Sequence, residues 1–435
     1  MMRKKPLILG LLTGAALGAA ILGAARRAST TQPLAPKPPL ATLNISPADR
    51  QMHRAEAAIM AAPHRPDGYN LLAAAFIQKA RETGDAGFYA RAGAALDRST
   101  QIAPDNFMAA SLRATLLVAA HRFSEALQAA RRAQSLNPES PDVYGAMTDA
   151  LVELGDYTAA VQAAQKMMDL RPDLASYARV SYLRQLHGDT EGAVLAMRVA
   201  VDAADRRDPE RAAWCLVQLG QQLMTLGRAG EAEQAFDAAL DLFPNYYMAL
   251  SAKAHARAAA GDFTSAIDLY KRSLARVPAP DTAIALGDLY TRLGQTNEAK
   301  RQYDLVEFIE RSGPMAGAYS RQMALFWADH DMRFDEAVEI MRRARHERAD
   351  IYTCDALAWC LFKKGEIEQA RQAITEAMRL QTRDARIFYH AGMIHAARGD
   401  RQNAAKYLKL ALEINPAFDL LQAEVARRTL AQILE

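Results

Sequence analysis

Apolar and polar residues follow one another along most of this chain with the period of an amphipathic helix. Between residues 69 and 418 the pattern comes in pairs of segments, each about a dozen residues long. A Gly-Asp turn separates many of the pairs, as at Gly155-Asp156, Gly261-Asp262 and Gly399-Asp400. Glycine suits the end of a helix because it adopts a positive φ without strain. The pattern predicts successive helix-turn-helix hairpins, and therefore an all-α fold.

Two markers recur along these hairpins with one period. A proline closes many of the pairs, and the interval from Pro104 to Pro138 is repeated from Pro138 to Pro172 and from Pro244 to Pro278. An alanine follows the turn at nearly the same interval, with longer gaps only before Ala232 and Ala337, at Ala126, Ala160, Ala193, Ala232, Ala266, Ala299, Ala337, Ala370 and Ala404. Proline ends the second helix because it cannot donate a backbone hydrogen bond. One hairpin cannot bury its apolar face alone, so the period predicts a stacked array.

These residues resemble the tetratricopeptide repeat (TPR), in which W-x₂-L-G-x₂-Y precedes A-x₃-F and P within a unit of about 34 residues. The clearest matches are Leu219-Gly220 with Ala232-x₃-Phe236 and Pro244, Leu286-Gly287-x₂-Tyr290 with Ala299-x₃-Tyr303, and Ala266-x₃-Tyr270 with Pro278. The resemblance implies a right-handed superhelical α-solenoid of about ten hairpins over residues 69–418. A capping helix is expected at residues 419–435.

The N-terminal region has a different composition. Residues 6–25 form an uncharged run between Arg3-Lys4-Lys5 and Arg26-Arg27, and this run is long enough to span a bilayer. We expect residues 1–27 to be a signal anchor, with a signal peptide cleaved near Gly23-Ala24-Ala25 as the alternative. Residues 28–49 are a proline-rich linker, and residues 50–68 are expected to form a lead-in helix. The basic residues place the array on the extracytoplasmic or periplasmic side, anchored to the membrane or secreted after cleavage.

Charge and motifs argue against catalysis and nucleic-acid binding. The 53 basic and 50 acidic residues nearly cancel, unlike the basic footprint of a nucleic-acid binder. His346-Glu347 lacks the second histidine of H-E-x-x-H, because Asp350 occupies its place, and His390 and His395 are five residues apart rather than four. We therefore expect no enzyme activity, no metal and no cofactor, and expect Cys215, Cys354 and Cys360 to be small apolar core residues.

The expected function is protein binding. The resemblance implies that the first helix of each unit lines a concave groove, and large side chains gather at those positions in the last three units, at Tyr319, Phe326, Tyr352, Asp355, Trp359, Phe362, Arg386 and Tyr389. Aromatic side chains of this kind form binding hot spots. The alternative interpretation is that the rings pack between neighbouring helices. The leading hypothesis is a membrane-anchored scaffold that binds peptide or protein partners.

Two other functions compete with it. The array resembles the repeat region that precedes the catalytic domain of O-linked N-acetylglucosamine transferases, so the chain could be a non-catalytic subunit that recruits substrates to a separate enzyme. Self-association into a membrane-linked homo-oligomer is the third hypothesis.

Overall fold

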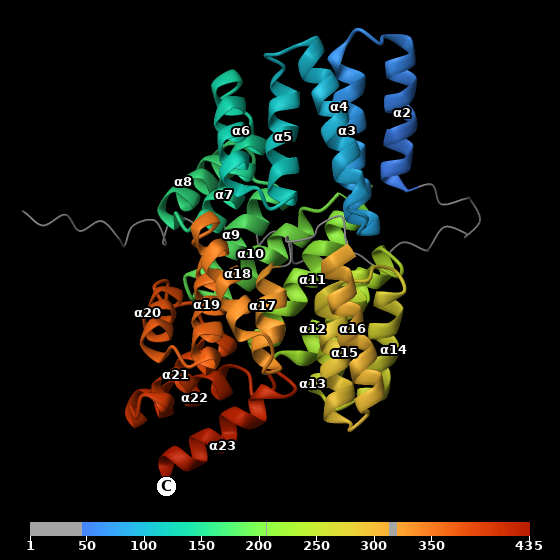
Figure 1. The fold of residues 1–435 in the computed structure, drawn as a ribbon. Coiled ribbons are helices and arrows are strands. Elements are labelled where there is room, and N and C mark those ends of the chain that lie inside the picture. Colours follow the sequence, from blue (N-terminus) through green and yellow to red (C-terminus); the bar gives the residue numbers. More distant parts are fainter. Residues whose placement is uncertain (1–45, 206, 313–319) are drawn as a thin grey trace, which may run out of the picture. The chain divides into compact units, whose positions relative to one another are not determined.

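The computed structural model describes residues 46–205, 207–312 and 320–435, and these residues contain α-helices and no strand. Figure 1 shows the helices in chain order, from α2 to α23. Their bounds are α2 Pro47–Ala61, α3 Pro66–Thr83, α4 Gly87–Ile102, α5 Phe107–Ala119, α6 Phe123–Leu136, α7 Pro141–Leu154, α8 Tyr157–Leu170, α9 Leu174–Leu186, α10 Thr190–Asp202, α11 Pro209–Thr225, α12 Ala229–Leu242, α13 Tyr247–Ala259, α14 Phe263–Leu274, α15 Pro280–Arg292, α16 Thr296–Ser312, α17 Ser320–Asp329, α18 Phe334–Glu347, α19 Ile351–Lys364, α20 Ile367–Ala377, α21 Ala385–Ala397, α22 Arg401–Ile414 and α23 Gln422–Leu434.

Successive helices pair into hairpins, from α3/α4 to α21/α22, so the described part of the chain contains ten units. The first helices of neighbouring units also pack together, as α5 does on α7 and α19 on α21. Helix α2 packs on α3 and α23 packs on α22, so one extra helix covers each end of the array. The predicted all-α stack of hairpins is confirmed. The predicted lead-in region corresponds to α2 and the start of α3, and the predicted capping helix to α23.

The Gly-Asp turns join the two helices of a unit as the sequence predicted. Gly155 ends α7 with φ +81°, a left-handed conformation that suits glycine. Asp156 then caps α8, because its side chain accepts a hydrogen bond from Ala159 N at 3.1 Å. The glycine ends one helix and the aspartate begins the next, so two residues are enough to reverse the chain.

The recurrent alanines lie where the two helices of a unit meet. All nine are buried, from Ala126 to Ala404. The glycines of the Leu-Gly matches also lie where the two helices of a unit meet. A Cβ atom on Gly220 would lie 2.3 Å from the Phe236 ring, and one on Gly287 would lie 2.3 Å from the Tyr303 ring. Each aromatic ring of the second helix therefore packs directly on the glycine backbone of the first, which explains why these two motif positions occur together.

The array also turns back on itself. In the first, third and fourth units, the turn inside the unit meets the loop between the units five and six places further along the chain. A Cβ atom on Gly84, in the first unit, would lie 2.5 Å from Val277, in the loop before α15. One on Gly155, in the third, would lie 2.6 Å from the Ala349 carbonyl oxygen, and one on Gly188, in the fourth, 2.7 Å from that of Gln381.

We call the contact of residues 153–157 and 186–188 with residues 348–354 and 379–382 the seam. It joins the third and fourth units to the loops before α19 and α21. Figure 1 shows α18 and α19 beside α7–α10, although the partners in the seam are far apart in the sequence. The seam creates tertiary contacts that the repeat pattern alone does not specify.

The predicted anchor at residues 1–27 and nearly all of the predicted linker at residues 28–49 lie outside the described residues. Within the described ranges, none of the helices combines the length and the apolar character that crossing a bilayer requires.

Candidate functional site

A pocket of about 350 Å³ lies where the last three units meet earlier ones. Its walls come from the ends of α9 and α11, from α17 and α19, from the residues that lead into α21, and from the segment between α22 and α23. The lining residues are Gln185, Thr225, Arg321, Leu325, Tyr352, Asp355, Thr382, Arg383, Asp384, Ala385, Arg386, Ile387, Ile414, Asn415 and Phe418. This volume lies within the range of sites that hold small ligands or parts of a peptide.

Three arginines line the pocket, and they differ in their partners. Arg321 is paired with the buried carboxylate of Asp350 at 3.3 Å, and Arg386 with Asp419 at 3.1 Å. Arg383 is exposed and has no ion-pair or hydrogen-bond partner among the described residues. A guanidinium presents a planar set of donors that matches a carboxylate, so Arg383 is the group best able to bind an added anion.

Carboxylates neutralise part of the positive charge of the arginines. Burial opposes the charge on Arg386, whose side chain is 43% exposed, but the surrounding carboxylates, Asp419 foremost, raise the pKa of its guanidinium above the ordinary value. Asp384 caps α21 by accepting hydrogen bonds from Arg386 N and Ile387 N, at 2.9 and 3.2 Å. The three arginines and two aspartates of the lining carry a formal charge of +1.

Apolar side chains supply the rest of the lining. Leu325 of α17, Tyr352 of α19, Ile387 of α21, Ile414 of α22 and Phe418 surround the charged groups. Ile387 and Phe418 are themselves buried, so they give the pocket a firm wall. The pocket can therefore receive a group with one apolar and one anionic part.

Of the predicted groove residues, Tyr352 and Asp355 line the pocket, and so does Arg386. Phe326, Trp359 and Tyr389 are only 2%, 1% and 1% exposed, so here the expectation of exposed aromatic rings is wrong. Phe362 is partly buried and stacks on Trp359 with ring centroids 5.0 Å apart. The side chain of Tyr319 lies outside the described residues.

The three buried rings are held between α17, α19 and α21. The Trp359 ring stacks on His390, with centroids 4.2 Å apart, and its Nε1–H donates to Asp329 Oδ1 at 2.8 Å. Tyr389 donates its hydroxyl hydrogen to Gln422 Oε1 at 2.7 Å. Each polar end is satisfied inside the protein, as buried tyrosine and tryptophan require. These three rings therefore belong to the packing next to the pocket and not to its lining.

Asp355 lines the pocket and also contacts His390, on which the Trp359 ring stacks. It is 4% exposed, and one of its oxygens lies 2.9 Å from His390 Nδ1. A carboxylate can only accept, so Nδ1 carries the proton in this bond. The contact fixes both side chains and leaves Asp355 at the edge of the pocket as a buried, paired group.

Sequence reasoning missed Arg321, Arg383 and the residues from α9 and α11. Arg321 lies two positions beyond the expected groove position at Tyr319, and Arg383 lies in a loop to which the groove pattern does not extend. Gln185 and Thr225 reach the pocket because the array turns back on itself, for which no local pattern exists.

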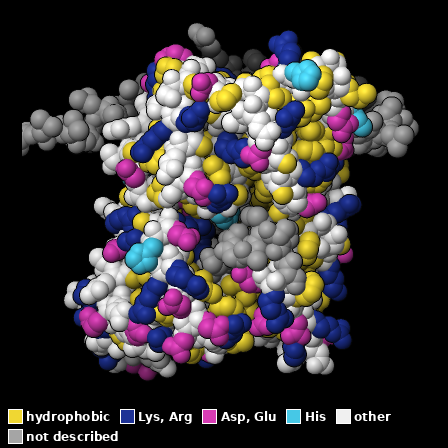
Figure 2. All heavy atoms as spheres, turned by 45° about the horizontal axis from the view of Figure 1, so that its top comes forward, with side chains coloured by type: hydrophobic (Ala, Val, Ile, Leu, Met, Phe, Trp, Pro, Cys, Tyr) yellow, Lys and Arg dark blue, Asp and Glu magenta, His cyan; other side chains and the backbone are white. Residues whose placement is uncertain are grey.

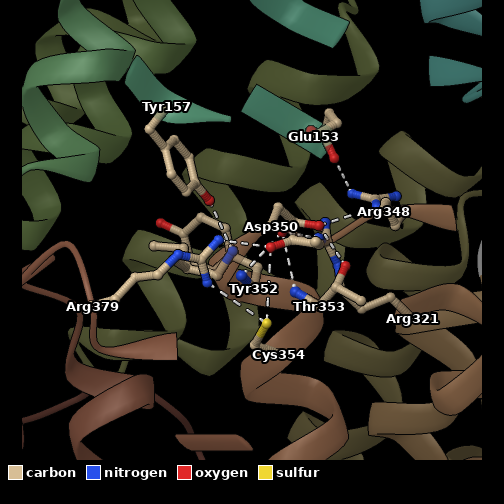
Figure 3. A network of polar contacts seen from close by, with 11 residues as sticks. Glu153, Tyr157, Arg321, Arg348, Asp350, Tyr352, Thr353, Cys354 and Arg379 are labelled. Carbon is tan, nitrogen blue, oxygen red and sulfur yellow. Dashed lines mark hydrogen bonds and ion pairs between the residues drawn. The ribbon is translucent and has the colours of Figure 1, made fainter. Parts of the chain in front are cut away.

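A polar network adjoins the pocket at the seam (Figure 3). Its centre is Asp350, which is 4% exposed on its side chain and accepts hydrogen bonds from Tyr352 N at 3.0 Å and Thr353 N at 3.1 Å. Arg348 Nε lies 3.1 Å from the other carboxylate oxygen, and Arg321 approaches the first. A buried carboxylate is tolerated when it is paired and hydrogen-bonded in this way.

Two contacts carry this network across to the third unit. Arg348 forms an ion pair with Glu153 of α7, and the two side chains are 14% and 24% exposed. Ile351 N donates to Tyr157 Oη at 2.9 Å. Burial raises the pKa of Glu153 despite Arg348, and it raises the pKa of the Tyr157 hydroxyl to about 12. At the seam these partly desolvated polar contacts therefore lie within a buried hydrophobic cluster that contains residues of both sides, Tyr157 and Ile351 among them.

The described residues contain no candidate metal centre, and the face drawn in Figure 2 is not dominated by one sign of charge. Within the described ranges, no group of three or more His, Cys, Asp or Glu residues is placed to hold a metal ion. On the face drawn in Figure 2, basic and acidic side chains are interspersed. The expectation that the chain lacks catalytic activity stays a prediction.

Comparisons with known proteins give a consistent result. Family models described as tetratricopeptide repeat match residues 117–185, 217–280 and 356–417. The tetratricopeptide repeat and J domain-containing co-chaperone DNJ1 of Fusarium oxysporum f. sp. lycopersici is 25% identical over 214 residues, which cover 46% of this chain and 40% of that protein. The match thus spans less than half of the relative's length.

Solved structures that match this chain include the human IFIT1 dimer with PPP-AAAA, which has a TM-score of 0.48 and 15% identity, with 73% of each chain covered. A tetratricopeptide repeat protein from Parabacteroides merdae has a TM-score of 0.35 and 20% identity, with 60% of this chain and 99% of that chain covered.

Proposed function

Because this chain is a tetratricopeptide-repeat protein, we propose that it is a scaffold that holds a peptide segment of a partner protein in the pocket beside α17, α19 and α21. The observation that carries the proposal is Arg383, an arginine that has no partner in the part of the chain that the structure describes, in a wall that is otherwise apolar or internally paired. Tyr352 and Asp355, which the groove pattern predicted, are the contacts expected on the α19 side.

The preferred segment carries an acidic side chain next to an apolar one. Arg383 supplies donors for the carboxylate, and Arg386 adds positive charge nearby. The apolar neighbour would pack against Leu325 and Ile414. Charge-assisted hydrogen bonds of this kind are roughly twice as strong as neutral ones, and they also fix the direction of the peptide.

Synthetic octapeptides that differ at one position, Glu, Gln or Lys, test this preference in fluorescence anisotropy. Arg383→Glu should weaken binding of the Glu peptides by about tenfold or more, because a like charge then faces the ligand. Arg428→Glu is the matched control, since Arg428 is an exposed arginine of α23 outside the pocket. Equal binding of Glu and Lys peptides, or no effect of Arg383→Glu, would contradict the proposal.

Anchoring to a membrane is a second part of the proposal. Its support is the uncharged run of residues 6–25 between basic clusters, which matches the thickness of a bilayer. The array would then face the extracytoplasmic or periplasmic space. Alkaline extraction of membranes, followed by N-terminal sequencing, separates an intact anchor from a cleaved signal. Recovery of the intact chain in the soluble fraction would rule out the anchor.

A further inference from the structure

We infer that the pocket is assembled by the seam, so that closing the seam and binding a ligand in the pocket stabilise each other. The first half of this inference concerns the protein alone. The second half rests on the proposed function.

The pocket walls come from two parts of the chain that are distant in sequence. Gln185 and Thr225 lie in the last turns of α9 and α11, whereas the remaining lining residues begin at Arg321. The seam fastens the two parts next to the pocket, because Thr382 Oγ1 donates to the carbonyl oxygen of Leu186. Thr382 lines the pocket itself, and Leu186 follows Gln185 directly. Separating Leu186 from Thr382 would therefore take one wall away from the other.

The same dependence exists at the other end of the seam. Arg321 and Tyr352 line the pocket, and both are held by Asp350, through the guanidinium of one and the backbone N–H of the other. Asp350 in turn is bonded to Arg348, whose other partner is Glu153 of the third unit (Figure 3). Loss of the pair between Arg348 and Glu153 would leave the hydrogen bond from Ile351 N to Tyr157 Oη as the remaining one of the two contacts that carry this network to the third unit.

The seam runs mainly through turns, loops and helix ends. Leu151 and Leu186 on one side and Ile351 and Cys354 on the other belong to one buried hydrophobic cluster, so apolar packing accompanies the polar contacts there. The pairs that stabilise each unit, such as α7 with α8 and α19 with α20, lie on one side or the other of the seam. Opening the seam would therefore leave every hairpin intact, and such local opening costs less than global unfolding.

Coupling follows from this geometry. A ligand that touches both walls binds the closed state better than the open one, and it shifts the population towards closure by that difference in affinity. By linkage, a substitution that opens the seam must lower the affinity for the ligand by the factor by which the ligand favours the closed state. This holds even where the substituted residue touches no ligand atom.

The test uses the full chain with spin labels on Cys residues introduced at Leu195 of α10 and Lys409 of α22, two exposed positions on opposite sides of the seam. The native Cys215, Cys354 and Cys360 are free and buried, and alanine replaces all three because Cys354 lies in the seam and would accept a label when the seam opens. Arg348→Met removes the pair with Glu153 and keeps the length of the side chain. Arg342→Met is the control, because Arg342 pairs with Glu366 at 2.9 Å, away from the seam.

We expect one narrow distance distribution in the parent and in Arg342→Met, and a broad, longer one in Arg348→Met. Amide exchange at Ile351, which bonds Tyr157 across the seam, should accelerate by about tenfold or more only in Arg348→Met, as expected for breaking a partly buried ion pair. If Arg348→Met loses helicity, Glu153→Gln provides the milder opening. Faster exchange at Ile351 with an unchanged distance between the labels would show that the pocket does not depend on the seam.

The ligand arm adds the Glu octapeptide defined above. It should narrow the distribution in Arg348→Met, and it should bind this variant about tenfold more weakly than the parent although Arg348 does not line the pocket. Equal affinity for both proteins would overturn the coupling. If the peptide binds neither protein, the proposed function fails, while the distance measurement still decides whether the seam assembles the pocket.

Discussion

The turns Gly155-Asp156 and Gly261-Asp262 have the same local structure and different surroundings. Both glycines have φ +81°, and both aspartates cap the next helix. A Cβ atom on Gly155 would meet the Ala349 carbonyl oxygen at 2.6 Å, whereas nothing lies within 4 Å of such an atom on Gly261. Identical turn chemistry therefore specifies the hairpin in both units, and the position of the unit in the array decides whether the turn has a long-range partner.

The register of the seam explains this difference. In the first, third and fourth units the turn meets the loop between the units five and six places further on, so the turn in the third unit meets the loop before α19. Gly261 is in the sixth unit, and the corresponding loop would follow an eleventh hairpin, whereas the described hairpins number ten. The turn at Gly155 therefore faces the loop before α19, and the turn at Gly261 faces no loop of the described residues.

Alanine at the two glycines should give the largest contrast. Both substitutions place a side chain at positive φ, which costs about 1–2 kcal/mol. Gly155→Ala also drives a Cβ atom into backbone at 2.6 Å, and overpacking of this kind adds about 1–3 kcal/mol. We expect the urea midpoint, followed by circular dichroism, to fall clearly more for Gly155→Ala than for Gly261→Ala. Equal shifts would mean that the seam opens freely around Gly155.

The residue after each turn gives a smaller contrast. Tyr157 follows the first turn and Phe263 the second, so only the seam turn has a hydroxyl there. That hydroxyl accepts the hydrogen bond from Ile351 N, which is buried. Tyr157→Phe should cost about 1–3 kcal/mol, because it leaves a buried donor without a partner. Amide exchange at Ile351 should rise by the corresponding factor. Unchanged exchange there would show that Tyr157 contributes only its ring.

The pH dependence of the seam is the smallest expected effect. Burial raises the pKa of Glu153 in the folded protein above its ordinary value of 4.5. The folded state then binds more protons than the unfolded state between these two values, so this contribution to stability is complete below pH 4.5 and is lost as the pH rises through the folded pKa. The slope cannot exceed about 1.4 kcal/mol per pH unit.

Urea midpoints measured from pH 4.5 upwards test whether stability falls with rising pH, as the raised pKa of Glu153 requires. Glu153→Gln should show a flatter profile than the parent. Asp142→Asn serves as the control, because Asp142 is an exposed carboxylate of the same helix, α7. A profile for Glu153→Gln that matches the parent would assign the pH dependence to other carboxylates.

The sequence predicts well those contacts that join helices close together in the chain. The constant repeat period, the Gly-Asp turns and the small alanines all report contacts between helices that are close in the chain, so the hairpins and their order could be predicted. Aromatic residues at the groove positions were ambiguous, because the same spacing also serves packing between first helices. Trp359 and Tyr389 are buried for this reason, while Tyr352 lines the pocket.

The seam and the pocket could not be predicted in the same way. Arg348 and Glu153 are 195 residues apart, and neither belongs to a recurrent motif. Which loop meets which turn depends on the small rotation added by each unit, and that rotation follows from packing rather than from pattern. The right-handed sense of the superhelix and the membrane anchor stay predictions.

The register of the seam also restricts how the gene for such an array could change. Open repeat arrays tolerate duplication or loss of whole repeats, because each repeat contacts only its neighbours. Excising one repeat here, for example residues 247–280, would shift the loop after α18 away from Gly155 and bring up the loop that contains Arg383, which has neither Arg348 nor Asp350. The copy number between the two sides of the contact is thus fixed by geometry, and sequence drift is expected to proceed by point substitution there.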